Sequence, residues 1–158
     1  MRRGCGAHRL GAIRGRPRRG SVITEGAGHG HQAFVNLPVK DLGRSRTFFT
    51  ELGLTFFGQA EDMASVIISE HTQVMLLTET VFASYARNGV VDATAGTEVI
   101  LVLGLETRDQ VDQLAEAAET AGGSPVGTPR DDGYRYQRGF TDLDGHHWEA
   151  LCLVDPAS

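Results

Sequence analysis

The chain has 158 residues, of which 41% are hydrophobic, and its 15 basic and 20 acidic residues give a net charge of −5. This length suits one ordinary domain or two small fused modules, with enough apolar residues to bury a core without disulfide bonds. No segment approaches the roughly 18 consecutive apolar residues of a membrane span, so we expect no association with a membrane.

The first 31 residues are rich in Arg and Gly and predict a disordered tail. Seven of the fifteen basic residues lie in the first twenty positions, which contain no acidic residue. The remaining residues, 21–158, carry eight bases and twenty acids, which argues against nucleic acid as a partner of the folded domain. The tail alone would suit RNA binding or targeting, or it is a plain disordered extension.

The two cysteines predict no disulfide framework, because Cys5 lies in the tail and Cys152 in a predicted strand. We expect both thiols to be reduced and the protein to be cytoplasmic. The tail also lacks the apolar segment of a secretory signal.

Residues 33–79 predict a strand, a helix and three further strands. The opening strand covers residues 33–39, and Asp41 is suited to cap the helix that follows it. Phe48 and Phe49 have the spacing of a buried helical face, and Gly53 is expected to end the helix. Short apolar runs then predict strands at 54–59, 64–69 and 73–78.

The same order of elements is predicted again in residues 97–154, after a linker of small residues. A strand at 97–105 carries one acid, Glu98, and Thr107 begins a helix with a capping box. Strands are expected near 124–126, 134–142 and 146–154. The repeat predicts an α+β fold of two βαβββ modules, related by a pseudo-twofold duplication, whose cupped mixed sheet surrounds a central cavity.

Residues 140–151 read as a strand, an Asp-Gly turn and a second strand. Alternation places His147 and Glu149 on one face of the second strand and Trp148 on the other, while His146 should face away from Glu149. Trp148 suits a packed core. Glu149 in an apolar strand needs a metal, a cation, a hydrogen-bonded ligand or water, because an unpaired buried carboxylate is costly.

Five residues are candidates for substrate binding. Asn36 is a polar residue within an apolar strand, and it would bond either a substrate carbonyl or nearby backbone groups. Tyr134, Tyr136 and Arg138 alternate onto one strand face, which would form either a cavity wall with stacking and guanidinium contacts or a solvent-facing surface. His147 would join the cavity beside Glu149 or lie at its rim.

Two stretches resemble the motifs of a known family. The opening segment 36–53, with Asn36-Leu37-Pro38-Val39-Lys40-Asp41-Leu42, resembles the first module of the vicinal oxygen chelate superfamily, the glyoxalase I, bleomycin-resistance and extradiol-dioxygenase group. Residues 142–149 resemble its closing motif, Asp-x-Asp-Gly-x-x-x-Glu. The resemblance covers residues 33–154 and is nearest to bacterial proteins described as predicted lactoylglutathione lyases.

The resemblance implies a divalent metal held by one inward side chain from the first and last strand of each module. By position these fall near Phe34, Leu76, Glu98 and Glu149. Glu98 and Glu149 are plausible oxygen ligands for Ni, Zn, Mn or Fe, and Glu149 or Glu98 would shuttle a proton. Phe34 and Leu76 cannot ligate a metal, so Asn36, His147 or water would have to complete the shell.

Two functions remain open from the sequence. One is a metal-assisted lyase or isomerase of glyoxalase type, in which the metal stabilises an enediolate or related oxyanion. The other is a metal-free protein that binds a drug or metabolite through aromatic and polar contacts. The resemblance implies a small-molecule ligand and a homodimer in both cases.

Overall fold

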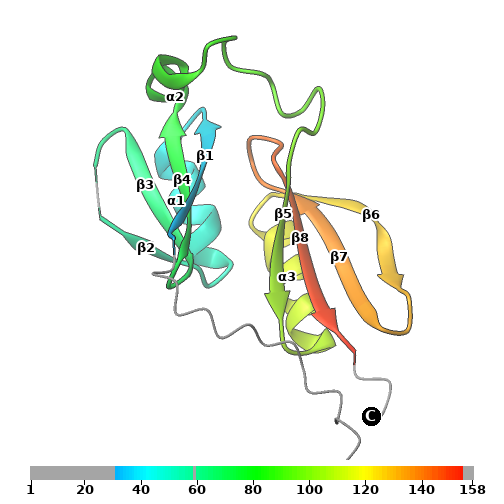
Figure 1. Ribbon diagram of the computed structural model, residues 1–158. Helices are drawn as coiled ribbons and strands as arrows, with labels where there is room; N and C mark the ends of the chain where they lie inside the picture. Colours follow the sequence, from blue (N-terminus) through cyan, green and yellow to red (C-terminus); the bar gives the residue numbers. More distant parts are fainter. Residues whose placement is uncertain (1–30, 59, 155–158) are drawn as a thin grey trace, which may run out of the picture. The chain divides into compact units, whose positions relative to one another are not determined.

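The structure is a computed structural model that describes residues 31–58 and 60–154 (Figure 1). The prediction of a disordered tail falls on residues 1–31, which with the exception of His31 lie outside the described residues, as does Cys5. No helix of the described segments is long and apolar enough to cross a membrane.

The predicted duplication is confirmed, because the order βαβββ occurs twice. The first module contains one helix that begins after Asp41, whose side chain accepts a hydrogen bond from the Arg44 amide as predicted. Its elements are β1 (Ala33–Val39), α1 (Leu42–Glu51), β2 (Thr55–Phe57), β3 (Met63–Ser69) and β4 (Thr72–Thr78).

The second module follows a short helix, α2 (Glu79–Tyr85), and a linker of residues 86–99. Its helix begins at the predicted capping box, in which Thr107 and Gln110 bond each other's backbone amides. Its elements are β5 (Ile100–Leu105), α3 (Arg108–Thr120), β6 (Ser124–Asp131), β7 (Arg135–Thr141) and β8 (His147–Leu153).

The boundaries of β5 and β6 differ most from the sequence prediction, and those of the other strands differ by at most two residues. The β5 strand begins at Ile100, so the predicted strand start at residue 97 is wrong and Glu98 lies in the preceding loop. The β6 strand runs to Asp131, five residues beyond its predicted end, because it pairs with β7 through a register shift between Val126 and Arg130.

Each module forms a four-stranded mixed sheet with equivalent topology. The orders are β1-β4-β3-β2 and β5-β8-β7-β6, with one parallel pair in each sheet, β1 with β4 and β5 with β8. The α1 helix contacts β3 and β4, and α3 contacts all four strands of the second sheet. Strand alternation therefore leaves each sheet an open face, which carries Phe34 and Asn36 in the first sheet and Val102 and Glu149 in the second.

The main buried cluster joins the two modules. It contains Leu37 and Val39 of β1, Phe48 and Phe49 of α1, and Trp148 of β8, all less than a tenth exposed. Phe48 and Phe49 meet edge to face with ring centroids 5.0 Å apart. Because α1 residues pack on β8 residues, the two modules share one hydrophobic core.

Candidate functional site

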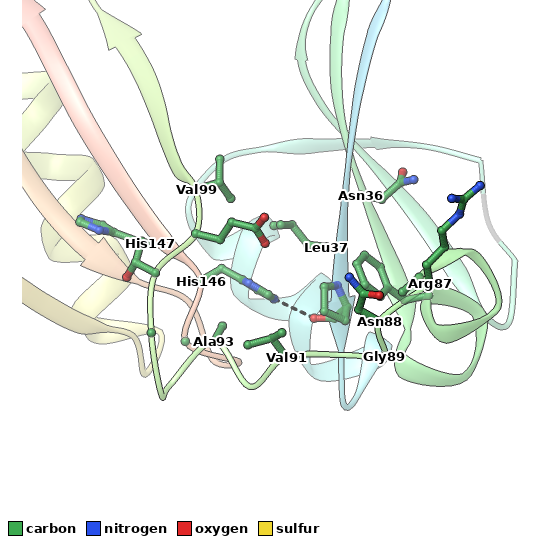
Figure 2. Close-up of a pocket in the computed structure, with 17 residues that line it drawn as sticks. Asn36, Leu37, Arg87, Asn88, Gly89, Val91, Ala93, Val99, His146 and His147 are labelled. Carbon is green, nitrogen blue, oxygen red and sulfur yellow. Dashed lines mark hydrogen bonds between the residues drawn. The ribbon is translucent and has the colours of Figure 1, made fainter.

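A cavity of about 420 Å³ lies where β1, the linker and the start of β8 meet. In Figure 2, Asn36 and Arg87 lie on one side of the cavity and Val99 and His147 on the other. Polar groups alternate in its lining with apolar side chains such as Phe82. This mixture is typical of sites for small molecules.

Asn36 reaches the cavity because of strand alternation in β1. Its neighbours Val35 and Leu37 contribute to the core, so Asn36 lies on the opposite, open face, in register with Met75 of β4. The side chain is exposed and makes no hydrogen bond to another described residue. Asn36 is therefore free to bond a ligand.

The linker forms a second wall, and its path is fixed at Gly145. Asp92 accepts hydrogen bonds from the backbone amide and the hydroxyl of Thr94, and these bonds lower the pKa of the Asp92 carboxyl. Thr94 then packs on Gly145, where a Cβ would lie 2.8 Å from its methyl group. Gly145 has φ of +95°, so this contact requires glycine for two separate reasons.

His147 is the first residue of β8 and lines the cavity. Glu149 and Gln137 lie near it on the same open face of the sheet. Its Nε2 atom is buried without a hydrogen-bond partner in the described residues and lies 3.7 Å from Glu149 Oε1. The Gln137 amide donates to the other carboxylate oxygen of Glu149, at 3.2 Å. The Gln137 amide thus holds Glu149 in place beside His147, and Glu149 borders the cavity residues without lining the cavity itself.

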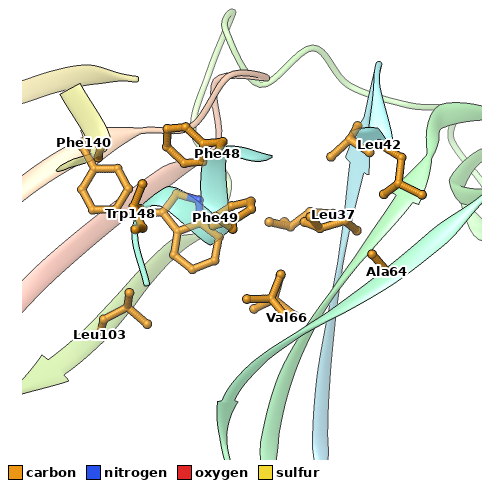
Figure 3. Close-up of a cluster of buried hydrophobic side chains, with 14 residues drawn as sticks. Leu37, Leu42, Phe48, Phe49, Ala64, Val66, Leu103, Phe140 and Trp148 are labelled. Atoms are coloured by element: carbon orange, nitrogen blue, oxygen red, sulfur yellow. The ribbon is translucent and has the colours of Figure 1, made fainter. Parts of the chain in front are cut away.

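The turn from Asp142 to His146 leads into β8 and so positions His147. The buried carboxylate of Asp142 holds this turn in place. Asp142 accepts hydrogen bonds from the backbone amides of Asp144 and His146 and from the indole of Trp148. Burial raises the pKa of the Asp142 carboxyl above its ordinary value, against the lowering effect of His146 and of these bonds. Trp148 is itself buried against Phe49, with ring centroids 5.1 Å apart (Figure 3).

The same turn bonds directly to the first module. Asp144 accepts hydrogen bonds from the Lys40 amide at 3.1 Å and from the Ser45 hydroxyl at 3.2 Å. The ring of His146 donates to the Pro38 carbonyl at 2.7 Å, drawn as a dashed line in Figure 2. We call residues 142–146 the closing turn. It holds the two modules together at the edge of the cavity.

Three of the site residues predicted from the sequence line the cavity, namely Asn36, Glu98 and His147. His146 faces away from Glu149 as expected, but it also lines the cavity while bonding Pro38.

Tyr136 and Arg138 lie on the other face of the second sheet, against α3. The Tyr136 hydroxyl donates to Asp112 at 2.8 Å, and Arg138 pairs with Asp112 and Glu119, each at 3.1 Å. Burial and the bond to Asp112 raise the pKa of Tyr136. Their alternation was predicted correctly, but the face they share is the one toward α3, and neither lines the cavity.

Tyr134 does not belong to β7 and is more than half exposed. The guanidinium of Arg135 lies 5.5 Å from the centre of its ring, on the hairpin between β6 and β7. This hairpin contributes no residue to the cavity.

Arg87, Asn88 and Phe82 were missed by the sequence analysis although all three line the cavity. For Arg87 and Asn88 the available signal was their position, since the sequence Arg-Asn-Gly begins directly after Ala86, the C-cap residue of α2. Gly89 has φ of +83°, a turn conformation that glycine adopts readily. A turn at that point reverses the chain and can direct polar side chains toward β1.

The donor set does not fit the four-ligand metal site that the resemblance implies. In register, the open-face positions of the parallel pairs are Phe34 with Gln73 and Val102 with Glu149. Leu76, carried over as one ligand position, is fully buried on the core side of β4. Among the described residues no three His, Cys, Asp or Glu side chains gather at one point.

Comparison with known proteins agrees with this fold. A profile of the Glyoxalase/Bleomycin resistance protein/Dioxygenase superfamily matches residues 30–150. A search of curated proteins gave no significant match.

Solved structures with the same fold come from several bacteria. A hypothetical protein from S. aureus is 31% identical, with a TM-score of 0.69 over 79% of this chain and 95% of the other. A glyoxalase/bleomycin resistance protein/dioxygenase family enzyme from Burkholderia phytofirmans is 16% identical, with a TM-score of 0.66 over 78% and 99%. The fosfomycin resistance protein FosX from Listeria monocytogenes is 15% identical, with a TM-score of 0.57 over 77% and 92%. With its duplicated βαβββ modules and a family match across most of its length, the chain belongs to the Glyoxalase/Bleomycin resistance protein/Dioxygenase superfamily.

Proposed function

We propose that this protein binds a small polar molecule in the cavity beside the closing turn, as a metal-free binding member of its superfamily. The observation that carries the proposal is the cavity of about 420 Å³, within the usual size range of ligand pockets. Asn36, Arg87 and Asn88 offer donors and Glu98 an acceptor around an apolar surface that includes Phe82 and Val99. A ligand would bury its apolar body there, and the polar groups would orient it.

Binding is tested by filling the cavity. The full chain is screened against a library of small molecules by thermal shift, and hits are checked by NMR. Val99→Trp, which places an indole at the cavity lining, should abolish the shifts. Leu153→Trp is the matched control, because Leu153 is exposed and does not line the cavity. Equal binding by both variants would contradict the proposal.

Metal-assisted lyase or isomerase chemistry is the second candidate, and Glu149 is the observation that favours it. Its carboxylate lies on an open sheet face beside His147, where it would take or give a proton on a substrate carbon. Elemental analysis of the purified chain, after exposure to Ni²⁺, Zn²⁺, Mn²⁺ and Fe²⁺, separates the two candidates. Stoichiometric metal that is lost in Glu149→Ala would favour the enzyme and overturn metal-free binding.

We also propose that the protein is a homodimer. The β1 and β5 strands are sheet edges, and their open-face residues Phe34, Ile100 and Val102 are each about half exposed. Apolar edge strands of this kind invite pairing with a second copy. Light scattering on the full chain should give a dimer mass, and Val102→Lys should shift it toward the monomer, whereas Phe57→Lys on the β2 edge should not.

A cytoplasmic location stays a prediction.

A further inference from the structure

The cavity gathers polar side chains that have no partner within the described chain. Arg87 is the one arginine of residues 31–58 and 60–154 whose guanidinium makes neither an ion pair nor a hydrogen bond. The others are all engaged, namely Arg44, Arg46, Arg108, Arg130, Arg135 and Arg138. An arginine left free at a cavity is available to an external anion.

The asparagines show the same pattern. The chain contains two, Asn36 and Asn88. Both line the cavity, and neither side chain hydrogen-bonds to another described residue. Both asparagines are solvent-exposed, so their amide groups, like the unpaired guanidinium of Arg87, are available to a ligand that enters the cavity.

These donors suit a carboxylate better than a phosphate. A guanidinium binds a carboxylate through two parallel hydrogen bonds, and amide N–H groups can satisfy its remaining lone pairs. A phosphate monoester carries close to two negative charges, and Glu98 in the same lining would repel it.

Glu98 in turn supplies the opposite charge. Its carboxylate forms no ion pair or hydrogen bond with another described residue, and Arg87 is not within ion-pair distance of it. The cavity thus offers one cation and one anion that do not neutralise each other. The same lining contains apolar side chains, among them Phe82, Val91 and Val99.

We propose that the cavity takes a zwitterionic small molecule of the amino-acid class, with its carboxylate on Arg87, Asn36 and Asn88, its ammonium on Glu98, and its side chain on the apolar lining. This assignment rests on the proposed binding function and names its ligand class. Neither charge alone explains the lining, because a simple carboxylate would leave Glu98 unpaired and a simple amine would leave Arg87 unpaired.

The experiment uses the full chain and compares the affinities of three related compounds. The twenty proteinogenic L-amino acids are titrated by NMR, and the tightest binder is compared with its analogue lacking the amino group and its analogue lacking the carboxylate. For phenylalanine these are 3-phenylpropanoate and 2-phenylethylamine. The zwitterion should bind about tenfold or more tightly than either analogue, because each charge pair adds on the order of 1.4 kcal/mol.

Two variants assign the charges to residues. Arg87→Gln should weaken the amino acid about fivefold or more and leave the amine analogue unchanged, while Glu98→Gln should weaken the amino acid and spare the carboxylate analogue. Arg130→Gln is the control, since Arg130 pairs with Asp132 away from the cavity and its loss should change no affinity.

The outcomes separate this proposal from the broader one. If the single-charge analogues bind as tightly as the zwitterion, or if no amino acid binds while other small molecules do, the ligand class is wrong and the binding function stands. If the cavity-filling Val99→Trp variant changes no binding of any molecule, both fail.

Discussion

The carboxylate of Asp144 accepts a hydrogen bond from the hydroxyl of Ser45 at 3.2 Å, although 99 residues separate the two in sequence. Both side chains are buried, and the Lys40 amide bonds the same carboxylate. The contact therefore ties the closing turn of the second module to the start of α1 in the first.

Loss of this contact should destabilise the fold strongly. We expect Asp144→Ala to lower the free energy of unfolding by about 2–4 kcal/mol, because the buried Ser45 hydroxyl and the part-buried Lys40 amide lose their acceptor, and Ser45→Ala by about 1 kcal/mol. Urea unfolding of the double variant should show less than the sum of the two losses. Glu70→Ala, at an exposed turn, is the control. Additive losses would mean that the bond does not contribute.

Asp142 predicts a pH dependence of stability. Its raised pKa means that the folded state holds the proton more tightly than the unfolded state, whose pKa is about 3.9. Its contribution is complete below that pH and is lost as pH rises through the folded pKa. The stability advantage of the wild type over Asp142→Asn should therefore shrink as pH rises from about 3 to 7, measured by urea unfolding at each pH. A constant or growing difference would contradict the raised pKa.

Gly145 and Gly133 form a matched pair for testing the linker contact. Both have positive φ, +95° and +82°, but a Cβ at Gly133 meets nothing within 4 Å, whereas at Gly145 it would lie 2.8–2.9 Å from Thr94 atoms. Gly133→Ala should cost about 1 kcal/mol from backbone strain alone. Gly145→Ala should cost clearly more and also weaken ligand binding, since the linker must move. Equal costs in thermal unfolding would show that the contact is loose.

Trp148 should be the most sensitive core position. It is fully buried, packs on Phe49 and donates to Asp142. Trp148→Phe is expected to lower the free energy of unfolding by about 2–3 kcal/mol, through lost contacts and an unsatisfied acceptor. Circular dichroism in urea measures the loss. Phe57→Leu serves for comparison, because Phe57 is mostly exposed and its change should fall within about 0.5 kcal/mol.

The local parts of the fold could be predicted from the sequence because their causes are local. The caps at Asp41 and Thr107 and the alternation of Trp148 with Glu149 depend on residues a few positions apart. They were enough to predict two βαβββ modules.

The direction of a strand face could not be predicted in the same way. Alternation grouped Tyr136 with Arg138 but did not say whether the group faces α3 or the open side. The deciding partners are Asp112, Glu116 and Glu119, whose spacing places the acids on one face of α3. The closing turn was also beyond local patterns, because its partners in β1 and α1 are about a hundred residues away.

The position of the closing turn has a consequence for how the chain folds during synthesis. The Lys40 amide and the Ser45 hydroxyl are made early, but their acceptor Asp144 leaves the ribosome about a hundred residues later. The β8 strand that follows is an interior strand of the second sheet, between β5 and β7, so that sheet is completed last as well. The first module must therefore wait, partly unsatisfied, until residues 142–153 have been made, and the docking of these residues completes both modules in one step.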